Sequence, residues 1–146
     1  MIMISACLVG VRCRYDGNEV PNPELVELFK QGRAIPICPE VLGGLDIPRA
    51  SCEKVCKDGK TMVLNQNGDD CTSQFLEGAR ISTEIALAVG VKHAILKSKS
   101  PSCGCGKVYD GTFSKRLVDG NGLTAQAFIA NGIQVWNEEN YIEWLK

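Results

Sequence analysis

The chain has 146 residues, of which 45% are hydrophobic, and a formal net charge of −1. A chain of this length fits one domain, residues 1–146, that can bury a core without disulfide or metal staples. The balanced charge argues against a strongly charged partner, such as a nucleic acid polymer or an anionic membrane surface. No apolar run approaches the roughly 20 residues of a membrane span.

The first residues, Met1–Cys7, lack the basic start and the long apolar stretch of a secretory signal peptide. We therefore expect a cytoplasmic protein in a reducing compartment, where disulfides are rare. Metal, cluster or thiolate chemistry is then expected for some of the cysteines, and the rest are expected to be small buried hydrophobic residues. The eight cysteines are Cys7, Cys13, Cys38, Cys52, Cys56, Cys71, Cys103 and Cys105.

The first half of the chain alternates between short apolar runs and helical spacing. Residues 1–6 predict a buried strand, which a loop with glycine and charged residues follows. Residues 23–32 have the apolar spacing of a helix that starts at a proline and ends at a glycine. Residues 34–38 predict a second strand, and residues 41–51 predict a loop because they contain two glycines and one proline.

The second half continues this alternation. An Asp-Gly pair predicts a hairpin over residues 54–65, and residues 72–90 predict a long amphipathic helix. A third strand, 93–96, leads into a loop rich in serine, glycine and cysteine at 98–106. The remaining predicted elements are a small hairpin over Lys107–Ser114 that turns at Asp110-Gly111, a helix over 123–131, a strand over 133–136 and a short helix over 138–145.

This order of elements predicts an α/β fold with a mostly parallel sheet of about four strands flanked by helices, a Rossmann-like architecture. Ligands bind such sheets beyond the carboxyl ends of the strands. Cys7 ends the first predicted strand, Cys38 ends the second, and Cys103 lies seven residues past the third. We therefore expect three thiols from distant parts of the sequence to converge on one edge of the sheet.

Thiols gathered in this way favour an iron–sulfur cluster. The alternatives are that they bind another metal or that they bind nothing. Each of the three loops pairs its cysteine with glycine or proline, so that the backbone can approach a ligand closely. A structural zinc site normally needs four ligands in spaced pairs. Only Cys52 and Cys56 have such spacing, Cys103 and Cys105 are too close together, and His93 lies inside a predicted strand.

Polar residues of the same loops are candidates for catalysis. Glu40 follows Cys38 by two residues and could act as an acid or a base. Ser98, Ser100 and Ser102 could position a substrate, or could only hydrogen-bond the turn at Pro101. Five basic residues could make the cleft mildly positive, or could be solvated on the surface: Arg12, Arg14, Arg49, Lys97 and Lys99.

At these loops the sequence resembles the thiouracil desulfurase family, and the resemblance covers essentially the whole chain. The matching segments are Ser5–Gly10 with Arg14–Gly17, Cys38–Val41 with Gly44-Leu45 and Pro48-Arg49, and Lys97–Gly104. The resemblance implies an oxygen-sensitive 4Fe–4S cluster held by Cys7, Cys38 and Cys103. It leaves one iron without a protein ligand.

The resemblance also implies a reaction on a small thio-compound such as 2-thiouracil. The free iron would take the sulfur of the thiocarbonyl, giving uracil and sulfide without a net redox change. Glu40 would transfer protons, and Ser100 or Ser102 would assist at the substrate. Cys13, Cys52, Cys56, Cys71 and Cys105 lie outside the implied ligand set, although Cys105 could compete with its neighbour Cys103.

Two other classes of function remain as alternatives. The first is a non-catalytic module that binds a metal or a nucleotide. The second is a thiol-redox protein that uses Cys103 and Cys105. The second is less favoured because the chain lacks a C-x-x-C motif before a helix.

Overall fold

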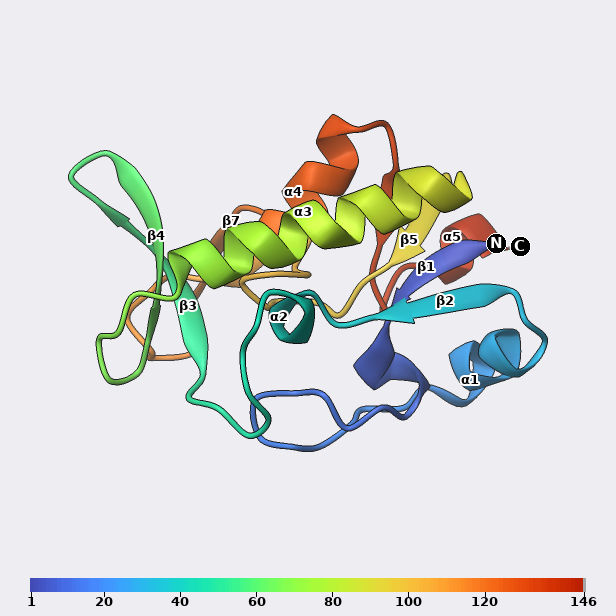
Figure 1. Cartoon of the computed structure of the whole chain (residues 1–146), viewed down its shortest axis with the longest axis horizontal. Helices are drawn as coiled ribbons and strands as arrows, with labels where there is room; N and C mark the ends of the chain where they lie inside the picture. Colours follow the sequence, from blue (N-terminus) through green and yellow to red (C-terminus); the bar gives the residue numbers. More distant parts are fainter. Residues whose placement is uncertain (146) are drawn as a thin grey trace.

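Four short parallel strands form the central sheet of the protein (Figure 1). The computed structural model describes residues 1–145. The strands lie in the order β2-β1-β5-β8, and each was predicted from its apolar run, at a slightly greater length. Their bounds are β1 Ile2–Ser5, β2 Ala34–Ile37, β5 His93–Ile95 and β8 Gln134–Trp136. The predicted α/β fold with a parallel four-stranded sheet is therefore confirmed.

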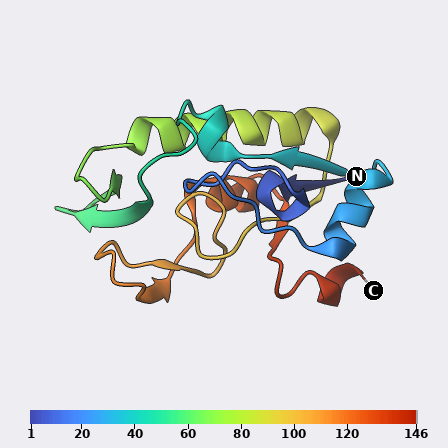
Figure 2. The same cartoon turned by 90° about the horizontal axis from the view of Figure 1, so that it is seen from below.

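Helices cover both faces of this sheet (Figures 1 and 2). The alternation of side chains along β1 supplies the core on each side. Met3 packs in one cluster with residues of α3 and α4, whereas Ile2 and Ile4 pack in a second cluster with residues of α1 and α5. The helix bounds are α1 Pro23–Lys30, α3 Thr72–Val89, α4 Leu123–Ala130 and α5 Ile142–Leu145.

Two helix ends lie at the predicted residues, the start of α1 at Pro23 and the end of α3 before Gly90. The side chain of Asn22 caps α1 by accepting hydrogen bonds from the N–H groups of Glu24 and Leu25. The long helix α3 ends at Gly90, whose φ of 83° lies in the left-handed region. The last helix begins later than residue 138, because Asn137 and Asn140 cross-bond each other's backbone in a turn that precedes it.

Two antiparallel hairpins lie beyond the carboxyl ends of the sheet strands, at the left of Figure 1. The first was predicted at its Asp-Gly turn, where Asp58 and Gly59 have φ values of 53° and 76°. The bounds of the hairpin strands are β3 Cys52–Lys57 and β4 Lys60–Asn65 in the first, and β6 Lys107–Tyr109 and β7 Leu117–Asp119 in the second.

The second hairpin corrects a prediction. A tight hairpin over Lys107–Ser114 with a turn at Asp110-Gly111 is wrong, because a longer loop separates β6 from β7. The reason is a long-range contact that local sequence does not reveal. The carboxylate of Glu53 on β3 accepts hydrogen bonds from the N–H groups of Gly111 and Phe113, which draws this loop toward the first hairpin.

Two short helical turns replace parts of the predicted loops. A 3-10 turn, η1, covers Ala6–Val9 directly after β1, and α2 covers Pro39–Leu42 directly after β2. Each has four residues, which is too short for a helical apolar pattern to be recognised. Both turns begin next to a cysteine that was predicted to end a strand.

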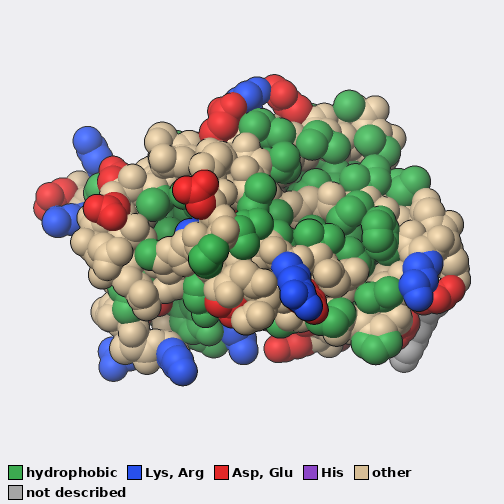
Figure 3. All heavy atoms as spheres, turned by 60° about the horizontal axis from the view of Figure 1, so that its bottom comes forward, with side chains coloured by type: hydrophobic (Ala, Val, Ile, Leu, Met, Phe, Trp, Pro, Cys, Tyr) green, Lys and Arg blue, Asp and Glu red, His purple; other side chains and the backbone are tan. Residues whose placement is uncertain are grey.

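The surface carries no continuous field of one charge in the view of Figure 3. Basic side chains stand singly or beside acidic ones, and hydrophobic side chains gather on the half of this face that holds the central sheet. No helix within residues 1–145 is long and apolar enough to cross a membrane.

Candidate active site

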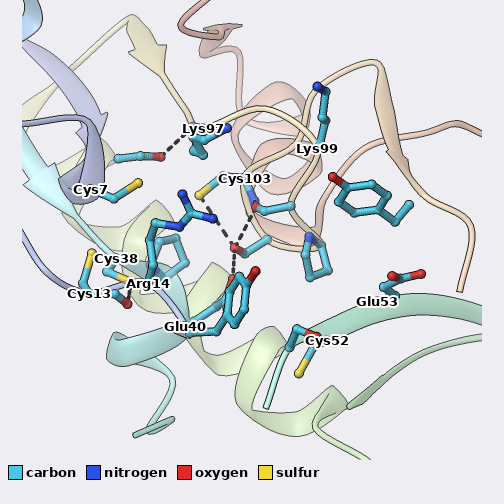
Figure 4. A pocket seen from close by; sticks show the side chains of 18 of the residues that line it. Cys7, Cys13, Arg14, Cys38, Glu40, Cys52, Glu53, Lys97, Lys99 and Cys103 are labelled. Carbon is cyan, nitrogen blue, oxygen red and sulfur yellow. Dashed lines mark hydrogen bonds between the residues drawn. The ribbon is translucent and has the colours of Figure 1, made fainter. Parts of the chain in front are cut away.

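A cavity of about 390 Å³ lies between the carboxyl ends of the sheet strands and the two hairpins (Figure 4). The loops after β1, β2 and β5 contribute Cys7, Cys38 and Cys103 to its lining. The structure thus brings together the three thiols that the strand order placed at one edge. Glu40, Ser100 and Ser102 line the same cavity.

Cys7 and Cys38 are held by the two short helical turns. Cys7 lies within η1, which closes at Gly10, a residue with a φ of 95°. Cys38 is the residue before the first turn of α2, where Pro39 occupies a position that needs no N–H donor. Each thiol is therefore fixed within two residues of the end of a sheet strand.

The loop of Cys103 is fixed by the start of α4. The first N–H groups of this helix, at Leu123 and Thr124, donate to the carbonyls of Pro101 and Ser102 at 2.8 and 2.9 Å. A Cβ on Gly122 would lie 2.4 Å from the carbonyl carbon of Ser102, so only glycine permits this approach. The Cys103 loop therefore has a rigid backing.

The helix that carries Glu40 packs backbone to backbone against α3. A Cβ on Gly78 of α3 would lie 1.9 Å from the carbonyl oxygen of Pro39. In the reverse direction, a Cβ on Gly43 would lie 1.9 Å from the carbonyl oxygen of Gln74. Two facing glycines thus set how far Glu40 stands from the sheet.

Glu40 is an almost buried carboxylate with both oxygens engaged. Arg49 donates to its Oε1 from Nε at 3.2 Å and from Nη2 at 3.1 Å. The side chains of Arg49 and Glu40 are only 8% and 14% exposed, so the ion pair is little screened by solvent. Ser102 Oγ donates to the other oxygen, Oε2, at 2.7 Å.

The serines of the third loop have separate tasks. Ser102 Oγ lies 2.7 Å from Glu40 Oε2 and 3.7 Å from Cys103 Sγ, so it stands between the carboxylate and a thiol. Ser100 Oγ accepts from the backbone N–H of Cys103 at 2.7 Å and lies 3.3 Å from Ser102 Oγ. Ser98 instead donates from its N–H and its hydroxyl to Glu138.

The basic residues divide into two groups. Arg14, Arg49, Lys97 and Lys99 line the cavity, and Lys97 pairs with Glu138 at 2.7 Å. Arg12 does not line it; its side chain is 76% exposed and pairs with Glu19. A further cavity lysine, Lys115, comes from the loop between β6 and β7, whose path the sequence did not predict.

The thiols of the cavity are unfavourable places for negative charge. Burial raises the pKa of Cys103 to about 12, and the neighbouring Cys38 and Glu40 add to this effect. A hydrogen bond with Cys13, together with burial, also raises the pKa of Cys38. Thiolates gathered here need a positively charged group to stabilise them, as a metal centre does.

The chemistry of the donor set fits an iron–sulfur cluster. Three cysteine side chains from separate loops, Cys7, Cys38 and Cys103, line one cavity. A multi-iron cluster distributes its thiolates over separate irons, and cysteine is its usual ligand. The zinc alternative also loses its spaced pair, because Cys52 and Cys56 lie along one extended strand and Cys56 is exposed.

Sequence reasoning missed the closeness of Cys13 to the other thiols. Cys7, Cys13 and Cys38 all line the cavity, and the Cys38 thiol donates to the backbone carbonyl of Cys13 at 3.6 Å (Figure 4). The neighbouring Cys38 thiol lowers the pKa of Cys13, but the neighbouring Cys7 thiol and burial outweigh this effect and raise the pKa to about 11. The available signal was the position of Cys13 in the Cys7 loop, directly before Arg14.

Other cysteines have different surroundings. Cys105 does not line the cavity, and its sulfur faces the carbonyl oxygen of Val135 at 4.0 Å. Cys52 lines the cavity from β3 and packs with Cys71 in a separate apolar cluster. His93 lies on β5, where its ring stacks on Trp144 with centroids 4.1 Å apart.

A family model and a solved structure show which family the chain belongs to. A family model for 2-thiouracil desulfurase matches residues 2–140. An uncharacterised protein of Bacillus subtilis (strain 168), YbbK, is 35% identical over 144 residues, which span 94% of this chain and 95% of that protein. The solved structure of TudS, a [4Fe-4S]-dependent thiouracil desulfidase, has a TM-score of 0.88 and 40% identity, covering 97% of this chain and 93% of TudS.

Proposed function

The chain belongs to the 2-thiouracil desulfurase family, and from this premise we propose that it is a [4Fe-4S]-dependent enzyme that desulfurates thiolated pyrimidines. The reaction exchanges sulfur for oxygen: a thiocarbonyl and one water give a carbonyl and hydrogen sulfide, without a net redox change. The observation that supports it in this chain is one cavity that joins three loop cysteines to an acid–serine pair.

In this proposal Cys7, Cys38 and Cys103 hold the cluster. All three line one cavity, and two of them, Cys7 and Cys103, are almost fully buried. When bound, the cluster supplies a thiophilic iron without a protein ligand, a Lewis acid that polarises the C=S bond. The rigid loops keep the three thiols at one side of the cavity before any metal arrives.

Glu40 is the proton-transfer residue of the proposal. Its Oε2 already accepts a hydrogen bond from the Ser102 hydroxyl, and the distance of 2.7 Å between Oγ and Oε2 is short enough for proton transfer. Glu40 would take a proton from the attacking water, directly or through Ser102 Oγ, and return it to the departing sulfide. Ser100 keeps the loop in place by accepting from the N–H of Cys103.

Arg49 has a supporting role in this arrangement. Its guanidinium binds Glu40 Oε1 through two N–H groups and donates to the carbonyl oxygen of Cys13 at 3.1 Å. It therefore orients the carboxylate so that Oε2 faces Ser102, and it ties the first cysteine loop to α2. An arginine does this better than a lysine because its planar group offers several donors.

We place this reaction in the cytoplasm, in a single desulfurase domain of residues 1–146, with no nucleic acid polymer as partner. Reducing conditions keep the eight cysteines available as thiols, and the chain's net charge is only −1. The substrate is a small molecule, because the cavity of about 390 Å³ suits a single heterocycle with its substituents.

The deciding experiment is anaerobic reconstitution with iron and sulfide, followed by incubation with 2-thiouracil. We expect bound iron, bound sulfide and release of sulfide with formation of uracil. Replacing Cys7, Cys38 or Cys103 by alanine should abolish both iron binding and turnover. The matched control is Cys105→Ala, which removes a nearby thiol that does not line the cavity.

The same experiment separates the alternatives. A binding module would take up a ligand in fixed stoichiometry without releasing sulfide, and Glu40→Gln would not matter. A thiol-redox protein would be active without iron and would lose activity in Cys105→Ser. Protein that binds no iron after reconstitution would contradict the proposed function.

A further inference from the structure

The loop between β6 and β7 forms one wall of the cavity. The cysteines, Glu40 and Ser102 of the proposed reaction come from other loops. Tyr109, Phe113 and Lys115 line the cavity from this side. Figure 4 shows Glu53, which holds this loop, at the opposite end of the cavity from Cys7 and Cys38. A substrate whose sulfur reaches the thiol side must therefore present the rest of its ring toward this wall.

Phe113 has an unfavourable backbone conformation. Its φ is 57°, in the left-handed region, where a bulky aromatic residue is rare. Lys115, also in the cavity lining, has a φ of 63°. Strained residues persist only where the surrounding structure holds them, and they concentrate at ligand sites.

Hydrogen bonds to Glu53 hold the backbone of Phe113 in this conformation. Its side chain comes from β3, is buried with the residue only 8% exposed, and accepts from the N–H groups of Gly111 at 2.9 Å and Phe113 at 3.1 Å. A Cβ on Gly111 would lie 2.7 Å from the carbonyl oxygen of Lys54, so the loop lies directly on the first hairpin. One oxygen of a buried carboxylate, Oε1, thus binds two N–H groups of this loop, at the end of the cavity opposite Cys7 and Cys38 (Figure 4).

We propose that Phe113 is a specificity-determining residue that packs its ring against the flat heterocycle of the substrate, and that Glu53 is its positioning residue. This inference rests on the proposed function, because that function supplies the flat heterocycle. Aromatic rings pack favourably in offset or edge-to-face arrangements, and the second aromatic residue of the wall, Tyr109, extends the same surface. Strain at Phe113 is then the cost of presenting the ring to the cavity.

The decisive variant is Phe113→Gly. Glycine accepts a φ of 57° without strain, so this change should leave folding intact or improve it. If the ring binds substrate, the KM for 2-thiouracil should rise about tenfold while kcat stays within about twofold. Phe113→Tyr keeps the ring and should restore the KM, and iron content should match the wild type in both variants.

Glu53 is tested by a pair of variants that differ in one property. Glu53→Gln keeps an acceptor oxygen for the two N–H groups and should keep the wild-type KM. Glu53→Ala removes the acceptor and should raise the KM as Phe113→Gly does, with unchanged iron content. Glu84→Ala is the control, because this carboxylate lies on α3, is exposed and pairs with Arg80.

Two results would overturn the inference. One is a wild-type KM in Phe113→Gly, and the other is a loss of iron or of kcat in that variant, which would make Phe113 structural. Calorimetric binding of 2-thiouracil separates this inference from the proposed function. If the wild type releases no sulfide, the function fails, yet tighter binding by the wild type than by Phe113→Gly still supports the wall. Equal affinity, or no binding to the wild type, refutes it.

Discussion

Glu40 illustrates how one side chain can be oriented from two sides. Arg49 binds one carboxylate oxygen and Ser102 the other, and each partner belongs to a different loop. A carboxylate in such a place has a defined direction for accepting a proton. Its role can therefore be tested by replacing the carboxylate with an amide, which removes the charge and the basicity but keeps the shape.

In Glu40→Gln the amide cannot take a proton, although it keeps a similar size. We expect sulfide release to fall by about 10²-fold or more, with iron content unchanged. The measurement is sulfide release at saturating 2-thiouracil beside iron quantification, with Glu84→Gln as the surface control. Activity within a few-fold of the wild type would remove Glu40 from the mechanism.

Cys52 and Cys56 should differ sharply in reactivity, although both lie on β3. Burial raises the pKa of Cys52 to about 12, and Cys71 beside it adds to the shift, whereas Cys56 is exposed. A raised pKa lowers the thiolate fraction at pH 8, and thiolate is the reacting form. Iodoacetamide at pH 8 should therefore modify Cys56 long before Cys52, as peptide mass spectrometry would show. Equal rates would contradict the burial of Cys52.

The meeting of Cys7, Cys38 and Cys103 was predictable, because parallel strands end at the same edge of their sheet. The place of Cys13 was not, because it depends on how an irregular loop returns to Cys7. Phe113 was unpredictable for a related reason. Its loop is set by Glu53, 60 residues earlier in the chain, and no local pattern marks that contact.

At the scale of elements, the contact between α2 and α3 matters most for the site. Facing glycines, Gly43 and Gly78, bring the two backbones together. The position of Glu40 is a direct result, since this residue lies in the first turn of α2.

Gly78→Ala should push these two helices apart, because the new methyl group would lie 1.9 Å from the carbonyl oxygen of Pro39. We expect the free energy of unfolding to fall by about 1–3 kcal/mol, together with lower sulfide release as Glu40 moves. Urea unfolding of metal-free protein measures the first effect. Leu76→Ala, at an exposed position of α3, is the control and should change little. Unchanged stability in Gly78→Ala would show that α2 adapts without cost.

The long helix α3 was predicted from its periodicity, and the four short sheet strands were predicted from their apolar runs. The short turns η1 and α2 were not, although η1 carries Cys7 and α2 carries Glu40. Four residues make a single turn, and their conformation is decided by packing rather than by a pattern. The details of the candidate site thus depend on elements below the length at which sequence periodicity is informative.

At the scale of the whole molecule, the cavity joins loops from both halves of the chain. A cluster bound there would link the segments after β1, β2 and β5, which are otherwise joined only by packing and hydrogen bonds. Binding to the folded state alone shifts the unfolding equilibrium toward that state.

Reconstituted protein should therefore melt at a temperature higher by about 5 °C or more than metal-free protein. Removal of iron with a chelator under anaerobic conditions should return the midpoint to the metal-free value. Differential scanning fluorimetry in sealed samples measures this, with Cys103→Ala as the control that should show no shift. Identical midpoints with and without bound iron would mean that the metal does not bridge these loops.

The rigid backing of the Cys103 loop has a consequence for biosynthesis. The carbonyls of Pro101 and Ser102 are held by N–H groups of Leu123 and Thr124, so this loop acquires its shape only once α4 has formed. If Cys7, Cys38 and Cys103 hold a cluster, their site is complete only after α4 has folded. The proposed cluster would then be inserted into a chain in which the residues up to Ala130 are already structured.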